Sequence, residues 1–352
     1  FWAVKPPVVF YVTAVLSVLS SGDMLALHVL SVCVSILLVA IAGIGVTIAV
    51  YQLTEDVLAA VTASVGLFVL PAFYGLPANG MRSSYLLVAF GASALAFSTR
   101  NQFRWAAVTA AVATLSYLPG GVFALVVVWQ AIKRRGTAGA QTTVLWGLGS
   151  AIVLLAPVVL LGAGKAFVAQ VVVAPLLTSS GGGIIGNFIN LWLATGPGIL
   201  AIPIATAGWV AVGRTNGSWW PAVGGAAFLI KVLVLDMESA PDAMGLMVFV
   251  ALGIGFTVKH GSNHARKLVA VSIVVLVVSA GIWVGAVRPV STGGAERSTD
   301  DAYAKDSIPQ METIYWEKRT PGCHYRLSQR EFQWIERTDA ELSNTRCIPW
   351  PI

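Results

Sequence analysis

The sequence predicts an all-α integral membrane protein: a polytopic helical bundle of about ten spans, with one juxtamembrane helix and a small C-terminal extracytoplasmic tail. Of the 352 residues, 57% are hydrophobic and only 11% are charged, and the mean hydropathy is +0.79. Soluble domains carry roughly 25% charged residues. Apolar runs of about 15 to 28 residues recur as far as Val287 without the alternation typical of strands, which favours membrane-spanning helices.

Charge divides the chain into a membrane part and a tail. Of the 16 acidic residues, six lie before residue 288 and ten lie after Val287. We therefore expect an outer juxtamembrane segment over 1–23, a transmembrane domain over 24–287 and an extracytoplasmic tail over 288–352. The formal net charge of +6 is interpreted as loop charge that sets the orientation in the membrane, and no nucleic-acid partner is expected.

Polar breaks separate ten predicted spans in the transmembrane domain. The spans are Met24–Leu53, Val57–Gly75, Met81–Ser98, Trp105–Leu118, Gly121–Ile132, Thr143–Leu161, Asn187–Val212, Trp220–Leu235, Ala243–Val258 and Leu268–Val287. A Pro-Gly-Gly sequence at 119–121 divides two short helices, which we expect to be partly buried against their neighbours. Asp23 is expected to cap the first span.

The segment Pro6–Ser21 is apolar with small polar interruptions, and two prolines open it. Two placements are compatible with this pattern, one that crosses the membrane and one that lies at its outer surface. A crossing would make the first break cytoplasmic, with Asp23 as its one charged residue. We therefore favour a juxtamembrane helix that begins at the double proline.

Basic residues fall in alternate breaks and thereby predict the orientation of the spans. These breaks contain Arg100, Arg104, Lys133, Arg134, Arg135, Arg214, Lys259, Arg266 and Lys267. Cytoplasmic loops are enriched in Lys and Arg, so these breaks are expected to face the cytoplasm. The remaining breaks carry only Arg82, Lys165 and acidic residues, and are expected to face outward. The pattern predicts a multi-pass protein of the cell membrane with an extracytoplasmic C-terminus.

Two cysteines, Cys323 and Cys347, lie in the predicted outer tail. Disulfides persist in oxidising surroundings such as the cell exterior, so we expect these two residues to be bridged. The bridge would close a loop of about 25 residues and contribute roughly 3 kcal/mol in the chain-entropy model.

Sequence motifs of common soluble enzymes are absent. There is no GxxxxGK[ST], HExxH, paired CxxC or GxSxG motif. The four histidines (His28, His260, His264 and His324) do not show metal-ligand spacing on one side of the membrane. The sequence predicts no metal ligands and identifies no definite cofactor. A divalent metal remains an open alternative as a cofactor.

Cations at the predicted outer surface are the main candidates for chemistry. They are Lys5, Arg82, Lys165 and Lys231. An ionisable residue within a span is a functional candidate, and Lys231 lies about one turn below the outer end of its span. Snorkelling of Lys231 to the interface is the alternative. Glu238 and Asp242, in the adjoining break, could pair with Lys231, act as a base or be solvated. Four cations on one side suit the phosphate of an anionic lipid.

The stretch 162–186 is the second irregular region. Lys165–Leu177 could form a short amphipathic helix, and the Gly/Ser run at 178–183 is typical of flexible chain. This long outer loop is compatible with a lid over a site and equally with a plain linker.

The string Lys5-Pro6-Pro7-Val8-Val9-Phe10-Tyr11 resembles the KPP element of GT-C fold glycosyltransferases, a superfamily that includes protein O-mannosyltransferases and lipid A aminoarabinose transferases. The string CHYRLS at 323–328 resembles the tails of archaeal dolichyl-phosphate-mannose mannosyltransferases. The resemblance implies an inverting hexosyltransferase that moves a sugar, mannose by this likeness, from a polyprenyl-phosphate donor. The expected acceptor is a surface-protein glycan or a protein, at the extracytoplasmic face of the bilayer.

The resemblance also implies site residues. The lysine of the KPP element, here Lys5, would engage the lipid phosphate. The catalytic carboxylate of such enzymes lies upstream of this element, so we expect it upstream of Phe1, with Glu238 or Asp242 as the fallback. Relatives carry an acidic residue where this chain has Arg82, so this arginine either replaces a metal or contacts phosphate directly. A transporter or lipid-linked-sugar flippase is the alternative function.

Overall fold

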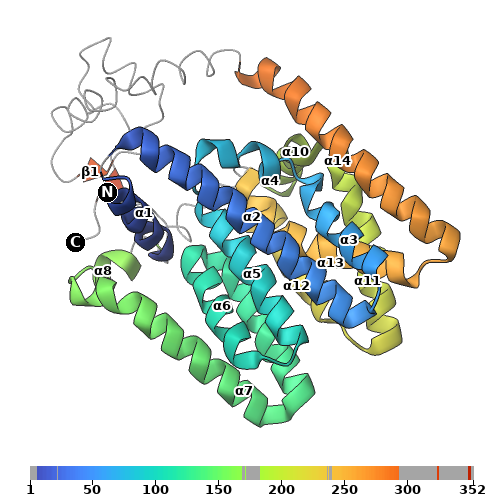
Figure 1. Ribbon diagram of the computed structural model, residues 1–352, viewed down its shortest axis with the longest axis horizontal. Helices are drawn as coiled ribbons and strands as arrows, with labels where there is room; N and C mark the ends of the chain where they lie inside the picture. The colour runs from blue at the N-terminus through green and yellow to red at the C-terminus, as the bar shows by residue number, and fades with distance from the viewer. Residues whose placement is uncertain are drawn as a thin grey trace. The chain divides into compact units, whose positions relative to one another are not determined.

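The computed structural model describes residues 6–21, 23–168, 171, 183–235, 237, 240–292, 323–324 and 348–349. The chain divides into a helical unit, Phe1–Gly285, and a second unit, Ala286–Ile352. The longer helices are α1 (Val8–Leu19), α2 (Met24–Thr54), α3 (Val57–Gly66), α5 (Ser83–Thr99), α6 (Phe103–Ser116), α7 (Gly121–Leu160), α10 (Gly183–Thr195), α11 (Ala201–Asn216), α12 (Trp220–Ile230), α13 (Met244–His260) and α14 (Asn263–Thr292) (Figure 1). Short turns connect them: η1 (Leu67–Val69), α4 (Ala72–Gly75), η2 (Pro77–Asn79), η3 (Leu118–Gly120), α8 (Gly164–Phe167), η5 (Gly196–Leu200), η6 (Lys231–Leu235) and η7 (Ala240–Ala243).

Five helical stretches among the described residues are long and apolar enough to cross a membrane. They are Leu25–Thr54, Leu118–Leu160, Gly183–Asn216, Ala240–His260 and Asn263–Ala286. Four shorter apolar helices accompany them, over Val8–Leu19, Val57–Val69, Ser83–Thr99 and Trp220–Leu235. The helical unit therefore fits the predicted all-α membrane class, while the count of ten spans stays a prediction.

Proline and glycine break two of the predicted spans. The span predicted over Val57–Gly75 is α3, η1 and α4, because Pro71 lacks a backbone N–H and holds the preceding residue in extended geometry. The span predicted over Asn187–Val212 is α10 and α11, joined by η5. Gly196 in η5 has φ +52°, a conformation that side chains with a Cβ rarely adopt.

Residues 133–142 were predicted to form a basic break between two spans. In the structure these residues are helical except at a single kink. Gly136 has φ +64° and ψ −155°, which divides α7 into two halves, here α7a (121–135) and α7b (137–160). The halves correspond to the predicted spans Gly121–Ile132 and Thr143–Leu161. Figure 1 shows α7b leaving the direction of α7a and running along one edge of the helical unit.

Helix α13 forms the centre of the helical unit. Within its most apolar window, 83% of the residues are buried, against 6% for α7 and 11% for α14. Phe249 of α13 stacks with Phe123 at 5.3 Å and packs against Phe228 at 5.7 Å between ring centroids. A Cβ on Gly208 of α11 would lie 1.9 Å from the carbonyl oxygen of Gly253, so these two helices approach through small residues.

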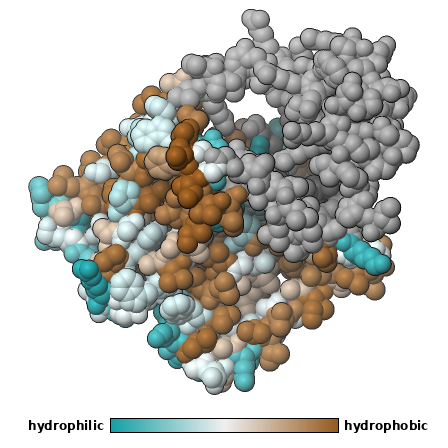
Figure 2. Space-filling view, turned by 180° about the vertical axis from the view of Figure 1, so that it is seen from behind, coloured by the Kyte–Doolittle hydropathy of each residue, from teal (hydrophilic) through white to brown (hydrophobic). Residues whose placement is uncertain are grey.

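Outer helices present their apolar side chains away from the bundle. Leu145, Ile152 and Val153 of α7b are 70%, 68% and 71% exposed. Apolar side chains also dominate the described face in Figure 2. Such a surface is unfavourable in water and suits contact with lipid chains.

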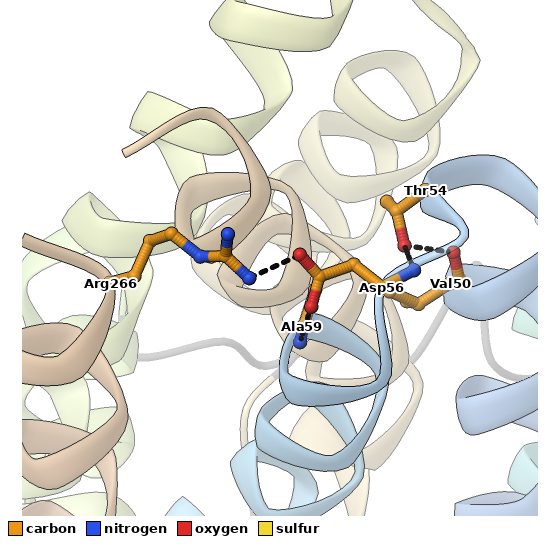
Figure 3. A network of polar contacts seen from close by, with 5 residues as sticks. All are labelled: Val50, Thr54, Asp56, Ala59 and Arg266. Atoms are coloured by element: carbon orange, nitrogen blue, oxygen red, sulfur yellow. Dashed lines mark hydrogen bonds and ion pairs between the residues drawn. The ribbon is translucent and has the colours of Figure 1, made fainter. Parts of the chain in front are cut away.

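Polar contacts close the helix ends, and the one between Asp56 and Arg266 is the most extensive. Asp23 accepts the N–H groups of Leu25 and Ala26, which confirms the predicted cap of α2. Asp56 caps α3 through the N–H of Ala59 and accepts a hydrogen bond from the Arg266 guanidinium at the start of α14 (Figure 3). This ion pair joins the turn between α2 and α3 to the turn between α13 and α14.

In the second unit, β1 (Cys323–His324) and β2 (Ile348–Pro349) pair antiparallel, with Cys323 opposite Pro349. Cys347 lies outside the described residues, so the predicted bridge stays a prediction.

Candidate functional site

A π-helix determines the position of Lys231. Helix α12 changes at Lys231 from α-helical to π-helical winding, which continues to Leu235. A π-helix holds one more residue per hydrogen-bonded turn than an α-helix, and such turns are frequent at functional sites. Lys231 therefore stands where the helix winding is locally widened.

Two asparagines of α10 hold the end of this π-helix. The side-chain amide of Asn187 donates to the carbonyl of Leu233 at 3.0 Å, and that of Asn190 donates to the carbonyl of Met237 at 2.8 Å. The two residues are three positions apart and so share one face of α10. Asn187 is 1% exposed, so its hydrogen bond is shielded from solvent. The asparagines fix the backbone that follows Lys231.

Lys231, Asp242 and Tyr117 form a compact polar group, which we call the Lys–Asp–Tyr cluster. The Lys231 ammonium lies 3.7 Å from Oδ1 of Asp242, and each side chain is 12% exposed. The Tyr117 hydroxyl donates to the same Oδ1 at 2.7 Å. Lys231 also lies 5.7 Å from the centroid of the Tyr117 ring, within cation–π range. The cluster joins the turns after α6, after α12 and before α13.

The cluster lies at the opposite end of α13 from the Asp56–Arg266 pair. Asp242 precedes the first residue of α13, and Arg266 follows its last residue. Because α13 has 17 residues and an α-helix rises 1.5 Å per residue, roughly 25 Å of helix separates these two polar groups. The predicted outer and cytoplasmic groups are thus at different ends of the helical unit.

The cluster presents one ammonium group, the kind of side chain that attracts an oxyanion. A largely buried ammonium attracts an oxyanion more strongly than an exposed one, because less water screens it. The phenol orients the carboxylate that holds the ammonium. No group of three or more potential metal-ligating side chains occurs in the part of the chain that the structure describes.

The other predicted site residues are dispersed or outside the description. Lys5 and Glu238 lie outside the described residues. Arg82 immediately precedes α5 and is half-buried, and no ion pair joins it to any other described side chain. Lys165 lies in α8 and is exposed. The structure therefore brings Lys231 together with Asp242 and leaves the roles of the other cations as predictions.

Sequence reasoning missed Tyr117, Asn187 and Asn190. Tyr117 is 125 positions from Asp242, so their contact depends on how α6 packs near α13. A polar aromatic residue two positions before Pro119 of the Pro-Gly break was the available signal. The two amides, three positions apart in an apolar helix, were a second signal.

Comparison with known proteins gives two matches. Residues 1–156 match the family described as DolP-mannose mannosyltransferase. A protein of Haloferax volcanii, "Dolichol phosphate-mannose mannosyltransferase", is 22% identical over 99% of this chain and 85% of its own length. No solved structure matches the chain. The resemblance to dolichyl-phosphate-mannose mannosyltransferases seen in the sequence is confirmed.

Proposed function

We propose that this chain is a membrane mannosyltransferase that takes mannose from a dolichyl-phosphate or similar polyprenyl-phosphate donor. The observation that carries the proposal is the Lys–Asp–Tyr cluster, a charged group at the end of an apolar helical unit whose sequence matches such transferases. An ammonium at that depth suits the phosphate of a donor whose lipid chain stays in the membrane.

The proposed reaction is one displacement with inversion. The acceptor hydroxyl oxygen attacks the anomeric carbon of mannose, and the bond from that carbon to the phosphate oxygen breaks. The bonding electron pair leaves with the polyprenyl phosphate, and a carboxylate takes the acceptor proton. Negative charge grows on the phosphate as the bond breaks, so a fixed cation beside it lowers the barrier.

Lys231 is the cation that we assign to this phosphate. Its widened π-helix and the two asparagine contacts hold the backbone in place, so little reorganisation is needed on binding. Lys5, Arg82 and Lys165 are proposed as further phosphate contacts. The GT-C architecture and the outward orientation of this end also belong to the proposal.

Asp242 is proposed as a positioning residue for Lys231. Oδ1 of Asp242 lies 3.7 Å from the Lys231 ammonium, and the same oxygen accepts a hydrogen bond from Tyr117. Because both groups engage this oxygen, we assign Asp242 to holding the ammonium and not to accepting the proton of the incoming hydroxyl. Glu238 stays a candidate for the base.

Most of the stretch 169–182 lies outside the described residues, so the two alternatives for it, a lid and a plain linker, stay predictions. The proposed acceptor is a surface-protein glycan or a protein.

A transporter is less well supported by the described helices. Ion and substrate pathways place charged side chains near the middle of spans. In the described part of the chain, charged residues gather at helix ends or at the α7 kink. Lys231, the deepest of them, is paired with Asp242 near the end of α12.

Mannose transfer in membranes tests the proposed function. Cells that make the protein would carry Lys231→Met, Lys231→Arg or the control Lys259→Met, an exposed lysine at the other end of α13, and their membranes would receive labelled dolichyl-phosphate mannose. We expect Lys231→Met to reduce transfer by about 10²-fold or more, with partial activity in Lys231→Arg, as for loss of one preorganised electrostatic contact. Full transfer by Lys231→Met at normal protein levels would refute the assigned site, and no donor-dependent transfer by the unchanged protein would refute the function.

A further inference from the structure

A second amphipathic surface lies along α6 and α7b, away from the Lys–Asp–Tyr cluster. An apolar groove of about 520 Å³ runs between these helices, lined by Val108 and Val112 of α6 and by Leu145, Gly149 and Val153 of α7b. The kink at Gly136 sets the direction of α7b. The groove is open along its length and faces away from the buried core.

A basic pocket of about 300 Å³ lies at the start of α6. It is lined by Gln102, Arg104 and Trp105 at that end of α6, and by Arg135 and Thr142 of α7. One Arg135 nitrogen donates to the carbonyl of Asn101 at 2.8 Å. Neither arginine forms an ion pair with a described carboxylate. The pocket therefore offers two guanidinium groups and neutral hydrogen-bonding side chains to an anion.

Arg104 connects the two features. Its guanidinium lies 5.7 Å from the ring centroid of Trp146, and Trp146 also lines the apolar groove. Trp105 and Trp146 are 61% and 48% exposed, as is typical of indole rings at the boundary between lipid chains and water. A polar pocket thus adjoins an apolar groove, an arrangement that matches the head group and the chain of a lipid.

This surface is at the other end of α6 from the proposed donor site. Arg104 is the second residue of α6, and Tyr117 follows its last residue. A helix of 14 residues is roughly 21 Å long, so one lipid phosphate cannot contact both places.

We propose that the basic pocket and the apolar groove together bind an anionic membrane phospholipid. Its phosphate would lie between Arg104 and Arg135, and one hydrocarbon chain would lie on the groove. The observations favour a phospholipid over a soluble phosphate because the apolar groove adjoins the pocket where Arg104 of the pocket contacts Trp146 of the groove. They favour it over the sugar donor because the pocket and the Lys–Asp–Tyr cluster lie at different ends of α6.

The test is lipid retention by the purified full chain in native mass spectrometry. The protein would be titrated with phosphatidylglycerol, with zwitterionic phosphatidylcholine and with inorganic phosphate. The head-group variant is Arg104→Gln/Arg135→Gln, and the chain variant is Gly149→Leu, which fills open space because a Cβ there meets nothing within 4 Å. The matched controls are Arg214→Gln, an exposed arginine outside the pocket, and Gly285→Leu, whose Cβ also meets nothing within 4 Å.

Phosphatidylglycerol should be retained in preference to phosphatidylcholine. Both test variants should weaken the retention of phosphatidylglycerol by about tenfold or more, because one loses charge-assisted contacts to the phosphate and the other loses the groove for the lipid chain. The two control variants should retain the lipid as the unchanged protein does. The two variants change different parts of the surface, so misfolding of one, detected by size-exclusion chromatography, leaves the other as the test.

Three results would overturn the proposal. The first is equal retention of phosphatidylglycerol by the folded test variants and the unchanged protein. The second is displacement of the lipid by inorganic phosphate at similar concentration, which would indicate a free-anion site. The third is measured with Lys231→Met protein, in which the proposed donor site is removed. If this protein binds a polyprenyl phosphate more tightly than phosphatidylglycerol, and if Arg104→Gln/Arg135→Gln abolishes that binding, the surface binds the sugar carrier instead.

Discussion

Replacing Lys231 by Met is the sharpest test of how the cluster recognises phosphate. The substitution keeps a long apolar stem and removes the ammonium that lies 3.7 Å from Asp242. We expect Lys231→Met to weaken the binding of a short-chain polyprenyl phosphate. Asp242→Asn should strengthen it, because the ammonium then loses a competing partner.

The distances set the size of these effects. At 3.7 Å the Lys231–Asp242 attraction is about 4 to 5 kcal/mol for an effective dielectric constant of about 20. A bound phosphate gains an attraction of the same order but weakens this pair, so only the difference contributes to affinity. Without Lys231, the Asp242 carboxylate and the phosphate repel each other. The dissociation constant should therefore rise by roughly 10- to 100-fold, or about 1.4 to 2.8 kcal/mol.

The double variant Lys231→Met/Asp242→Asn separates attraction from repulsion. It lacks both charges, so it should bind the lipid phosphate more weakly than the unchanged protein and about 3- to 10-fold more tightly than Lys231→Met alone, consistent with coupling between neighbouring residues. Binding would be measured by microscale thermophoresis in lipid nanodiscs at pH 7, at two salt concentrations. Lys259→Met is the control, because that lysine is exposed at the other end of α13.

Two outcomes would refute the reasoning. Binding by Lys231→Met within twofold of the unchanged protein would show that the ammonium does not contact the phosphate. If Asp242→Asn weakens binding as much as Lys231→Met, the ion pair is a structural unit that the phosphate does not enter. Thermal unfolding of each variant would be recorded to show that the binding data refer to folded protein.

Three further predictions concern the support of the site and the fold. Asn187→Ala should lower the free energy of unfolding by about 1 to 3 kcal/mol and weaken donor-phosphate binding, because the carbonyl of Leu233 in the π-helix loses its hydrogen-bond donor. Unchanged values in thermal unfolding and thermophoresis would contradict this prediction. Asp56→Asn should lower the melting temperature, because the ion pair with Arg266 is lost. Donor-phosphate binding by the folded protein should stay unchanged, because this pair is at the other end of α13 from Lys231. A loss of binding without a loss of stability would count against this prediction. Gly208→Ala should reduce the yield of folded protein, because the added Cβ would collide with the carbonyl oxygen of Gly253. Gly285→Ala should be tolerated, because a Cβ there meets nothing within 4 Å. Equal yields of the two variants in size-exclusion chromatography would contradict this prediction.

Helix ends with strong chemical markers were predictable from the sequence. The first long span was predicted over Met24–Leu53 and is α2, Met24–Thr54, because Asp23 caps its start and Glu55 adopts a left-handed conformation at its end. The break between Gly121–Ile132 and Thr143–Leu161 was predicted, but its narrowing to a kink at Gly136 and the break at Gly196 were not predictable from hydropathy. Hydropathy reports where a side chain prefers to be, whereas these breaks depend on a backbone angle.

The candidate site was predictable only where its residues are near in sequence. Lys231 and Asp242 flank one short break, so their pairing was one of the expected alternatives and is confirmed. Tyr117 and Asn187 come from distant helices, and their contacts follow from packing that a single sequence does not reveal.

The π-helix at 231–235 has a consequence for the ancestry of the site. Because a π-helix closes each hydrogen bond over one more residue than an α-helix, the backbone after Lys231 is out of register with a regular continuation of α12. Loss of one residue from this stretch would restore regular winding and turn everything downstream by about 100° around the helix axis. Relatives that lack this position would hold their equivalent of Asp242 against a different face of α12. A one-residue gap here, rather than a change of the lysine itself, would then mark the lineages in which the pairing was gained or lost.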